Sequence, residues 1–224
     1  IMLSRAAVRI ATEGVACVHN LMLGSFTAVG AGTDHADDEV GRQPRYTPYH
    51  IRHRTEVAGF NTILHGDDRI YNNIFIQNYQ PMADEKEAKD FGFDNQVAGT
   101  EVFDEYPTYD EWIANFEMDK PADMHKLMKY HFGHLPVWIN GNAYFNGAKA
   151  YKKEASNLVN DKDKVSVELV EQDGGYFLKT NVYDLMDEFK TGIINSDILG
   201  YAFEPEQRFE DPDGTEIIFT EDYL

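Results

Sequence analysis

Three segments of the chain share one pattern, in which an asparagine precedes three apolar residues and a small or polar residue ends the run. The asparagines are Asn20, Asn73 and Asn142. Their offsets, 73 − 20 = 53 and 142 − 73 = 69 residues, are too long and too unequal for a simple solenoid period. Long insertions must therefore separate the repeats. The short apolar runs end at Asn, Gly or Gln and show little helical periodicity, which favours strands over helices.

Stacked in register, these strands predict a parallel β-helix, an all-β fold in which turn asparagines hydrogen-bond to neighbouring turns through their side-chain amides. Three unrelated strands, each next to a turn-forming Asn, are the alternative. We expect a partial β-helix over residues 1–155, with long inserted loops at 27–58 and 78–134. Three turns are near the minimum for a stacked core, and an uncapped first turn around Asn20 would expose apolar surface.

Local signals add one helix and β-hairpins in the C-terminal third, residues 156–224. Thr108 followed by Glu111 reads as a capping box that begins a helix. The turn residues 172–175 lie between two apolar runs and predict a hairpin. Residues 211–219 suggest a second hairpin or an edge strand.

The charge of the chain excludes several partners. Lys and Arg number 20 against 39 Asp and Glu, a formal charge of −19, so neither nucleic acid nor an anionic membrane is expected as a partner. The single Cys17 excludes an internal disulfide and gives no sign of an oxidising compartment, which favours the cytoplasm. The first twenty residues lack the continuous apolar region of a secretory leader. The motifs of P-loop, dinucleotide-binding and serine-hydrolase sites are absent from the sequence.

The sharpest local feature is the pair Asp67 and Asp68, which leads directly into the second repeat. Successive side chains of an extended segment point to opposite faces, so only one of the pair can face a given groove. A carboxylate beside Arg69 would stay ionised at neutral pH, as a nucleophile requires. An Asp-rich turn that caps backbone N–H groups is the structural alternative.

Hydrolysis of a glycosidic bond is one reaction that such a nucleophile could serve. It also requires a carboxylic acid that stays protonated, and burial against aromatic surface raises a pKa in that direction. Glu101 and Glu105 lie in the sequence among Phe103, Tyr106 and several further aromatic residues. We therefore expect one of them to be desolvated. An acidic insertion such as this one also contains solvated glutamates without a function.

Residues 45–56 form a basic and aromatic cluster in an otherwise acidic chain. Tyr49 can stack on a sugar face, and His50 and His53 offer donors to ring hydroxyls, although an ordinary hydrated loop explains the cluster almost as well. The pairs His50–His53 and His131–His134 have a spacing that could hold zinc, but neither has a carboxylate in zincin spacing. Residues 34–39 could bind calcium but lack the EF-hand spacing. No metal site is predicted.

Four strings together resemble the family 120 glycoside hydrolases, which are β-xylosidases related to other right-handed β-helix enzymes. The strings are GVACVHNLMLGSF, RYTPYHIRHRTEVAGFNTILHGDDRIYNNIFIQ, GTEVFDEYPTYDEW and LPVWINGNAYFNGAKAYKKE, within residues 14–154. The resemblance implies a right-handed parallel β-helix, removal of xylose from the ends of xylo-oligosaccharides with retention of configuration, and no organic cofactor. Members of the family are much longer, so this chain resembles a C-terminal portion. Its partners would be a neutral oligosaccharide and either further copies of the chain or the missing N-terminal part of the β-helix.

The resemblance also assigns roles to residues. The family's nucleophile falls on the pair Asp67 and Asp68, with Asp68 favoured, and its acid/base on Glu101 first and Glu105 second. His50 and His53 match a motif that lines the sugar pocket. The other candidate substrate-binding residues are Tyr49, Arg69 and Trp138.

Two further functions are compatible with the sequence. The first is a non-catalytic carbohydrate-binding or scaffold module that keeps the β-helix and lacks the chemistry. The second is a β-helix polysaccharide lyase, which would need a Lys or Arg base and usually calcium. The charge of −19 disfavours the polyanionic substrate of a lyase.

Overall fold

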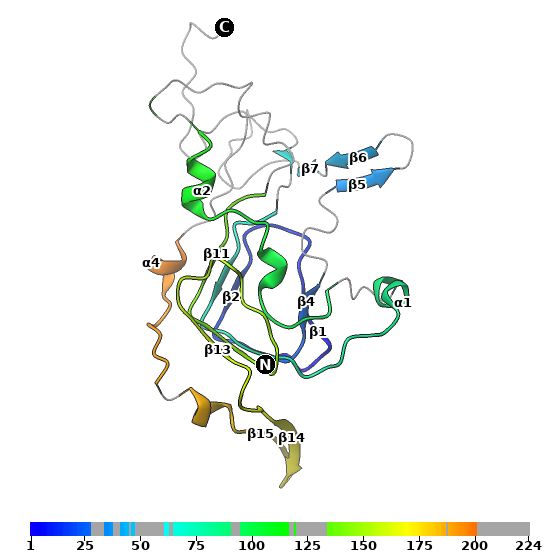
Figure 1. Ribbon diagram of the computed structural model, residues 1–224, viewed down its shortest axis with the longest axis vertical. Helices are drawn as coiled ribbons and strands as arrows, with labels where there is room; N and C mark the ends of the chain where they lie inside the picture. Colours follow the sequence, from blue (N-terminus) through cyan, green and yellow to red (C-terminus); the bar gives the residue numbers. More distant parts are fainter. Residues whose placement is uncertain are drawn as a thin grey trace, which may run out of the picture.

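The chain forms a parallel β-helix whose turns are stacked along one axis (Figure 1). The computed structural model describes residues 1–27, 34–37, 41–44, 46–47, 61–62, 65–90, 95–116, 119, 134–186 and 188–200. Among these residues, no helix is both long enough and apolar enough to cross a bilayer. The all-β fold predicted from the asparagine repeats is confirmed.

Two parallel sheets form adjacent sides of the coil. The first sheet contains β2 (Ala16–Val18), β9 (Arg69–Tyr71) and β11 (Trp138–Asn140), in the order β11-β9-β2. The second sheet contains β3 (Leu21–Met22), β10 (Ile74–Ile76), β12 (Asn142–Phe145) and β13 (Asn157–Asn160), in the order β13-β12-β10-β3. Three turns of the coil therefore each contribute one strand to each sheet, and β13 adds a fourth strand to the second sheet alone.

The corner between the two sheets explains why asparagine recurs. His19, Asn72 and Gly141 precede the three asparagines and have positive φ, which turns the chain from one sheet to the next. The backbone N–H of Asn20 donates to Oδ1 of Asn73 at 3.0 Å, and that of Asn73 donates to Oδ1 of Asn142 at 2.9 Å. The predicted stacking of asparagine side chains is confirmed. We call this chain of hydrogen bonds the asparagine ladder.

A glutamate ends the asparagine ladder. Oε1 of Glu154 accepts the backbone N–H of Asn142 at 3.0 Å and its side-chain Nδ2 at 2.9 Å. The hydroxyl of Tyr144 donates to Oε2 of Glu154 at 2.6 Å. Burial raises the pKa of Glu154, while these donors favour its ionised form. The Glu154 carboxylate thus supplies the acceptor that an asparagine side chain supplies to Asn20 and Asn73, while the residue in register with Asn142 on β13 is Asn157.

The third side of the coil includes part of the expected insertion at 78–134. Strand β1 (Ala6–Arg9) pairs with β4 (Ser25–Thr27), and single parallel bridges join Ser25 to Gly99 and Gly99 to Lys149. Gly99 therefore belongs to the second turn, which differs from the expectation of one continuous insertion. The first turn also differs from the uncapped state expected around Asn20, because Met2 bridges to Met22 and β1 covers β4.

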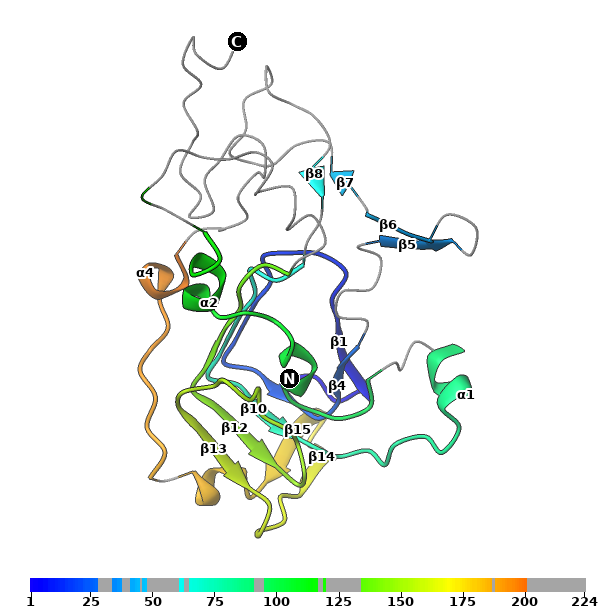
Figure 2. The ribbon, with the colours of Figure 1, turned by 45° about the horizontal axis from the view of Figure 1, so that its top comes forward.

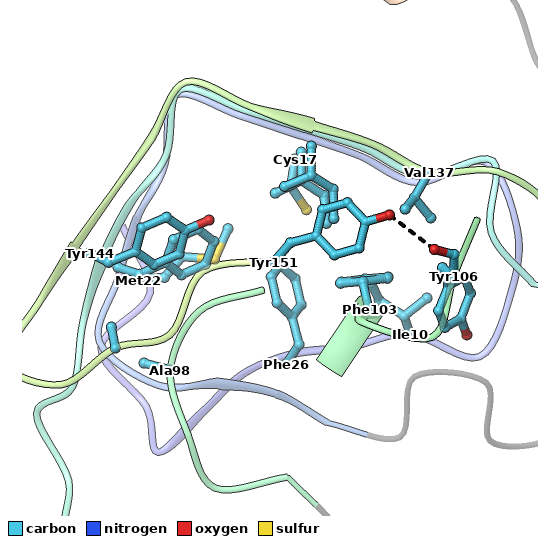
Figure 3. Close-up of a cluster of buried hydrophobic side chains, with 14 residues drawn as sticks. Ile10, Cys17, Met22, Phe26, Ala98, Phe103, Tyr106, Val137, Tyr144 and Tyr151 are labelled. Carbon is cyan, nitrogen blue, oxygen red and sulfur yellow. Dashed lines mark hydrogen bonds between the residues drawn. The ribbon is translucent and has the colours of Figure 1, made fainter. Parts of the chain in front are cut away.

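The core inside the coil is aromatic (Figure 3). Phe75 stacks on Tyr144 with ring centroids 5.3 Å apart, and Phe26 packs against both Phe75 and Phe103. Phe103 lies on the 3₁₀ helix η2 (Glu101–Phe103), so the segment after Gly99 fills the interior of the coil. The hydroxyl of Tyr151 donates to the carbonyl of Tyr106 at 2.9 Å and ties this segment to the third turn.

A second apolar cluster lies on the outer face of the second sheet, formed by Leu21, Ile76, Phe145 and residues of the C-terminal third. Burial on both faces explains why these strands are continuous apolar runs. The covering elements include the hairpin of β14 (Val167–Gln172) and β15 (Gly175–Thr180), followed by the 3₁₀ helix η3 (Val182–Leu185). The hairpin predicted around residues 172–175 is confirmed.

The remaining elements are short. The predicted capping box begins α2 (Tyr109–Ile113), with both hydrogen bonds between Thr108 and Glu111 formed. The other elements are α1 (Glu85–Asp90), α4 (Ser196–Leu199) and two antiparallel pairs, β5 (Asp34–Asp37) with β6 (Gly41–Pro44) and β7 (Tyr46–Thr47) with β8 (Asn61–Thr62) (Figure 2). The suggested hairpin at 211–219 lies outside the described residues.

Candidate functional site

Residues 65–69, which we call the Asp corner, stand where the second turn enters the first sheet. Gly66 bridges to Glu13 of the first turn, and the backbone N–H of Asp67 donates to the carbonyl of Pro136 in the third turn at 2.8 Å. Gly66 has φ +103°, and a Cβ there would lie 2.3 Å from the carbonyl oxygen of Leu135. Only glycine allows the turns to stack this closely. The Asp corner is thus fixed from both sides.

Asp67 forms an ion pair with Arg69. Asp67 has φ +55° and is only 1% exposed. The Nη1 group of Arg69 donates to the carboxylate and to the backbone carbonyl of Asp67. A nearby guanidinium favours the charged form of a carboxyl group. The carboxylate beside Arg69 that the sequence predicted is therefore present, and it belongs to Asp67.

The other contacts of Arg69 hold its side chain in place. Its guanidinium carbon lies 4.4 Å from the ring centroid of Trp138, and its Nε donates to the carbonyl of Leu199 at 2.7 Å. Tyr109 stacks on Trp138, with the two ring centroids 6.2 Å apart. Arg69 and Trp138, both predicted to bind substrate, thus lie in contact on the outer face of the first sheet. The next residue of each strand, Ile70 or Ile139, is buried on the inner face.

Asp68 faces the interior of the coil. It shares the side of the strand taken by the buried Ile70, and its Oδ1 accepts the backbone N–H of Val15 at 2.9 Å. Among the described residues, no hydrogen-bond partner reaches Oδ2. Burial raises the pKa of Asp68 from 3.8 to about 7, against the lowering effect of the Val15 hydrogen bond, with Asp67 and Glu13 adding repulsion. Asp68 is consequently the carboxyl group that holds a proton near neutrality.

We expect the free energy of unfolding to fall as pH rises from about 4 to about 7. In this range native Asp68 keeps a proton that the unfolded chain releases, so raising the pH favours the unfolded state. The difference between the two pKa values corresponds to at most about 4 kcal/mol. Asp68→Asn keeps an acceptor for Val15 and cannot ionise. In this variant, the free energy of unfolding measured with urea should therefore no longer fall between pH 5 and pH 8 through this group. If Asp68→Asn leaves the dependence of unfolding free energy on pH unchanged, the raised pKa of Asp68 is contradicted. The matched control is Asp173→Asn, at an exposed position.

Tyr106 and Glu13 also belong to this site, although their positions in the sequence gave no direct indication of it. The ring of Tyr106 stacks on His134 with centroids 4.1 Å apart, and the negative charge of Asp68 adds to burial in raising the pKa of Tyr106. A carboxylate oxygen of Glu13 accepts the backbone N–H of His65 at 3.0 Å. The offset of 53 residues between Asn20 and Asn73 places residue 13 beside residue 66 and could have indicated Glu13.

Glu101 and Glu105 are both exposed, so the desolvation expected from their aromatic neighbours is not found. Glu101 lies on η2, while its neighbour Phe103 is turned into the core. The Glu105 side chain is 89% exposed and lies 3.1 Å from Nζ of Lys152. The aromatic rings of this segment pack inward because η2 fills the coil, and the charged side chains therefore point to solvent.

The other predicted binding residues, Tyr49, His50 and His53, lie outside the described residues, as does His131. Within the part of the chain that the structure describes, no group of three or more His, Cys, Asp or Glu could hold a metal ion. Cys17 faces the same interior as Asp68, and burial raises its pKa to about 11. A neutral thiol of this kind is a poor nucleophile.

Comparison with known proteins adds one finding. No family model matches the sequence, and no curated protein matches it. The structure is similar to a solved structure of XylC in complex with xylose, with a TM-score of 0.63 and 27% sequence identity. The match covers 96% of this chain and 29% of the XylC chain. The chain therefore has a XylC-like β-helix fold and spans less than a third of the length of XylC.

Proposed function

We propose that this chain carries part of the active site of a retaining exo-glycosidase that releases xylose from xylo-oligosaccharides. The observation that carries the proposal is the ion pair of Asp67 with Arg69, next to Trp138 on the outer face of the first sheet. The likeness to XylC, whose solved structure contains xylose, supports the class of sugar. Net charge −19 is compatible with a neutral saccharide.

In this proposal Asp67 is the nucleophile. An ionised carboxylate attacks the anomeric carbon and forms a covalent glycosyl-enzyme, which water then hydrolyses. Asp68 is the rival candidate, but it faces the coil interior and holds a proton near neutrality, whereas a nucleophile has to be charged. Glu101 remains the first candidate for the acid/base and Glu105 the second. Their exposure means that bound substrate itself would have to shield the carboxyl from water.

Aromatic and basic groups next to Asp67 would bind the sugar. Trp138 and Tyr109, which stack on each other with Arg69 over Trp138, would contribute aromatic surface to the sugar site, and Arg69 would contribute a hydrogen-bond donor. Tyr49, for its aromatic ring, and His50 and His53, from the family resemblance, are proposed as further sugar-binding residues. In a retaining enzyme the nucleophile and the acid/base lie about 5 to 5.5 Å apart.

The test is hydrolysis of an aryl β-xyloside and of xylotriose by the purified chain. NMR of the first-formed xylose should show the β-anomer, the configuration of the substrate. A 2-deoxy-2-fluoro-xyloside with a good leaving group should label the chain, and peptide mass spectrometry should place the label on Asp67. Release of the α-anomer would overturn the retaining mechanism.

One observation favours a second candidate, a carbohydrate-binding module without catalysis. Asp67 and Asp68 are each only 1% exposed, so an entering sugar must first gain access to either carboxylate. Calorimetry would decide between the two functions. Binding of xylotriose without release of xylose supports the module, while turnover supports the glycosidase.

A further inference from the structure

A segment near the end of the described chain lies against the Asp corner. Residues 188–200, which we call the strap, run along the outside of the first sheet and end at α4 (Figures 1 and 2). Nδ2 of Asn72 donates to the carbonyl of Gly192 at 2.6 Å, and Nε of Arg69 donates to the carbonyl of Leu199 at 2.7 Å. The strap is therefore attached to the second turn of the coil at two places.

The second attachment involves the residue that pairs with Asp67. Arg69 uses Nε for Leu199 and Nη1 for Asp67, while the face of its guanidinium covers Trp138. The guanidinium is planar, so fixing Nε fixes the direction in which Nη1 points. Its side chain is only 11% exposed, which leaves little room for another orientation.

The geometry points to a positioning role for the strap: the carbonyl of Leu199 orients Arg69, and Arg69 in turn orients Asp67 and keeps it ionised. This inference rests on the proposed function for its catalytic meaning. Its physical content, the coupling of α4 to the ionisation of Asp67, can be measured without substrate. Leu199 is a positioning residue here because it acts through Arg69 and Asp67, and Arg69 positions Asp67 in addition to its proposed contact with the sugar.

Asn195 determines where the carbonyl of Leu199 lies. Its side-chain oxygen caps α4 by accepting the backbone N–H of Ile198 at 3.1 Å, and its carbonyl accepts the N–H of Leu199 at 3.0 Å. Gly200, with φ +65°, ends the helix immediately afterwards. Because α4 has a single turn, loss of its cap should unwind it. Asn195 thus provides a way to move the carbonyl without altering the Asp corner.

The experiment compares the full chain with Asn195→Ala, Asn195→Ser and Asn181→Ala. Asn195→Ser keeps a capping oxygen. Asn181→Ala is the matched control, because Asn181 caps Ser166 at the base of the hairpin. NMR follows the exchange of the Arg69 Nε–H with water and the titration midpoint of the Asp67 carboxyl carbon.

We expect Asn195→Ala to speed exchange of the Arg69 Nε–H by about tenfold, the scale of one lost charge-assisted hydrogen bond. The Asp67 titration midpoint should rise, and kcat for an aryl β-xyloside should fall about tenfold with KM nearly unchanged. In Asn195→Ser and in Asn181→Ala, the Arg69 exchange rate, the Asp67 titration midpoint and kcat should all stay close to those of the unmodified chain.

The outcomes separate this inference from the proposed function. Unchanged Arg69 exchange and Asp67 titration in Asn195→Ala would overturn the positioning role, even if the chain is an active glycosidase. An inactive chain in which Asn195→Ala still shifts the Asp67 titration would overturn the proposed function and uphold the coupling. Arg69→Lys serves as a second variant, because it keeps the charge and lacks both Nε and the planar face. It should raise the Asp67 midpoint as well, and an unchanged midpoint would overturn the role of Arg69.

Discussion

Asp67→Asn is expected to lower the rate of aryl β-xyloside hydrolysis by about 10³-fold or more, because an amide cannot form the glycosyl-enzyme. Asn has nearly the same shape and tolerates the positive φ of Asp67, so the variant should fold. Asp68→Asn should keep activity within about tenfold, a limit set by small shifts in the position of its neighbour. The measurement is kcat/KM for the three proteins at one pH.

The control is Asp173→Asn at the tip of the hairpin. Asp173 also has a positive φ, at 53°, so Asp173→Asn makes the same substitution in the same backbone conformation, but in an exposed turn. Its activity should equal that of the unmodified chain. Loss of activity in Asp68→Asn alone, with a fluoro-sugar label on Asp68, would reassign the nucleophile to Asp68. Equal activity of all variants would dismiss both aspartates.

The sequence predicted the parts of the fold that depend on local or repeated chemistry. The three asparagines stack as expected because each one supplies both a donor and an acceptor at the same corner of successive turns. Thr108 caps its helix by bonding to Glu111, three positions away, and the turn after Gln172 joins two adjacent strands. Each of these features is encoded within a few residues or within one repeated motif.

The candidate site was less predictable, because stacking brings together residues far apart in the sequence. Asp67 and Arg69 lie two residues apart and share one side of the strand, but the sequence does not specify the positive φ of Asp67. Tyr106, whose pKa the charge of Asp68 helps to raise, belongs to the segment around η2 that fills the coil, far from Asp68 in the sequence. The same placement of η2 leaves Glu101 exposed. The strap contact joins Arg69 to a residue 130 positions later, and no local pattern marks it.

Asn73→Ala is expected to lower the free energy of unfolding by about 3 to 5 kcal/mol, whereas Asn20→Ala should cost about 1 kcal/mol. Asn73 is 1% exposed, and its side chain bonds in both directions. Nδ2 donates to the carbonyl of Cys17 at 2.9 Å and to Oδ1 of Asn142 at 3.0 Å, while Oδ1 accepts two bonds from Asn20. Its removal leaves buried groups of both adjacent turns without partners, which is more costly than losing the bonds themselves.

Asn20 is the matched comparison because it stands at the start of the asparagine ladder. Its Nδ2 donates to Oδ1 of Asn73 and, in place of a carbonyl one turn earlier, to the carbonyl of Val18 two residues away. Urea unfolding of both Ala variants measures the difference, and Asn73→Leu separates hydrogen bonding from volume. Leu fills nearly the same space without polar atoms, so it should remain destabilised by at least about 2 kcal/mol. Stability restored by Leu would mean that packing, rather than the hydrogen bonds of the asparagine ladder, holds the turns together.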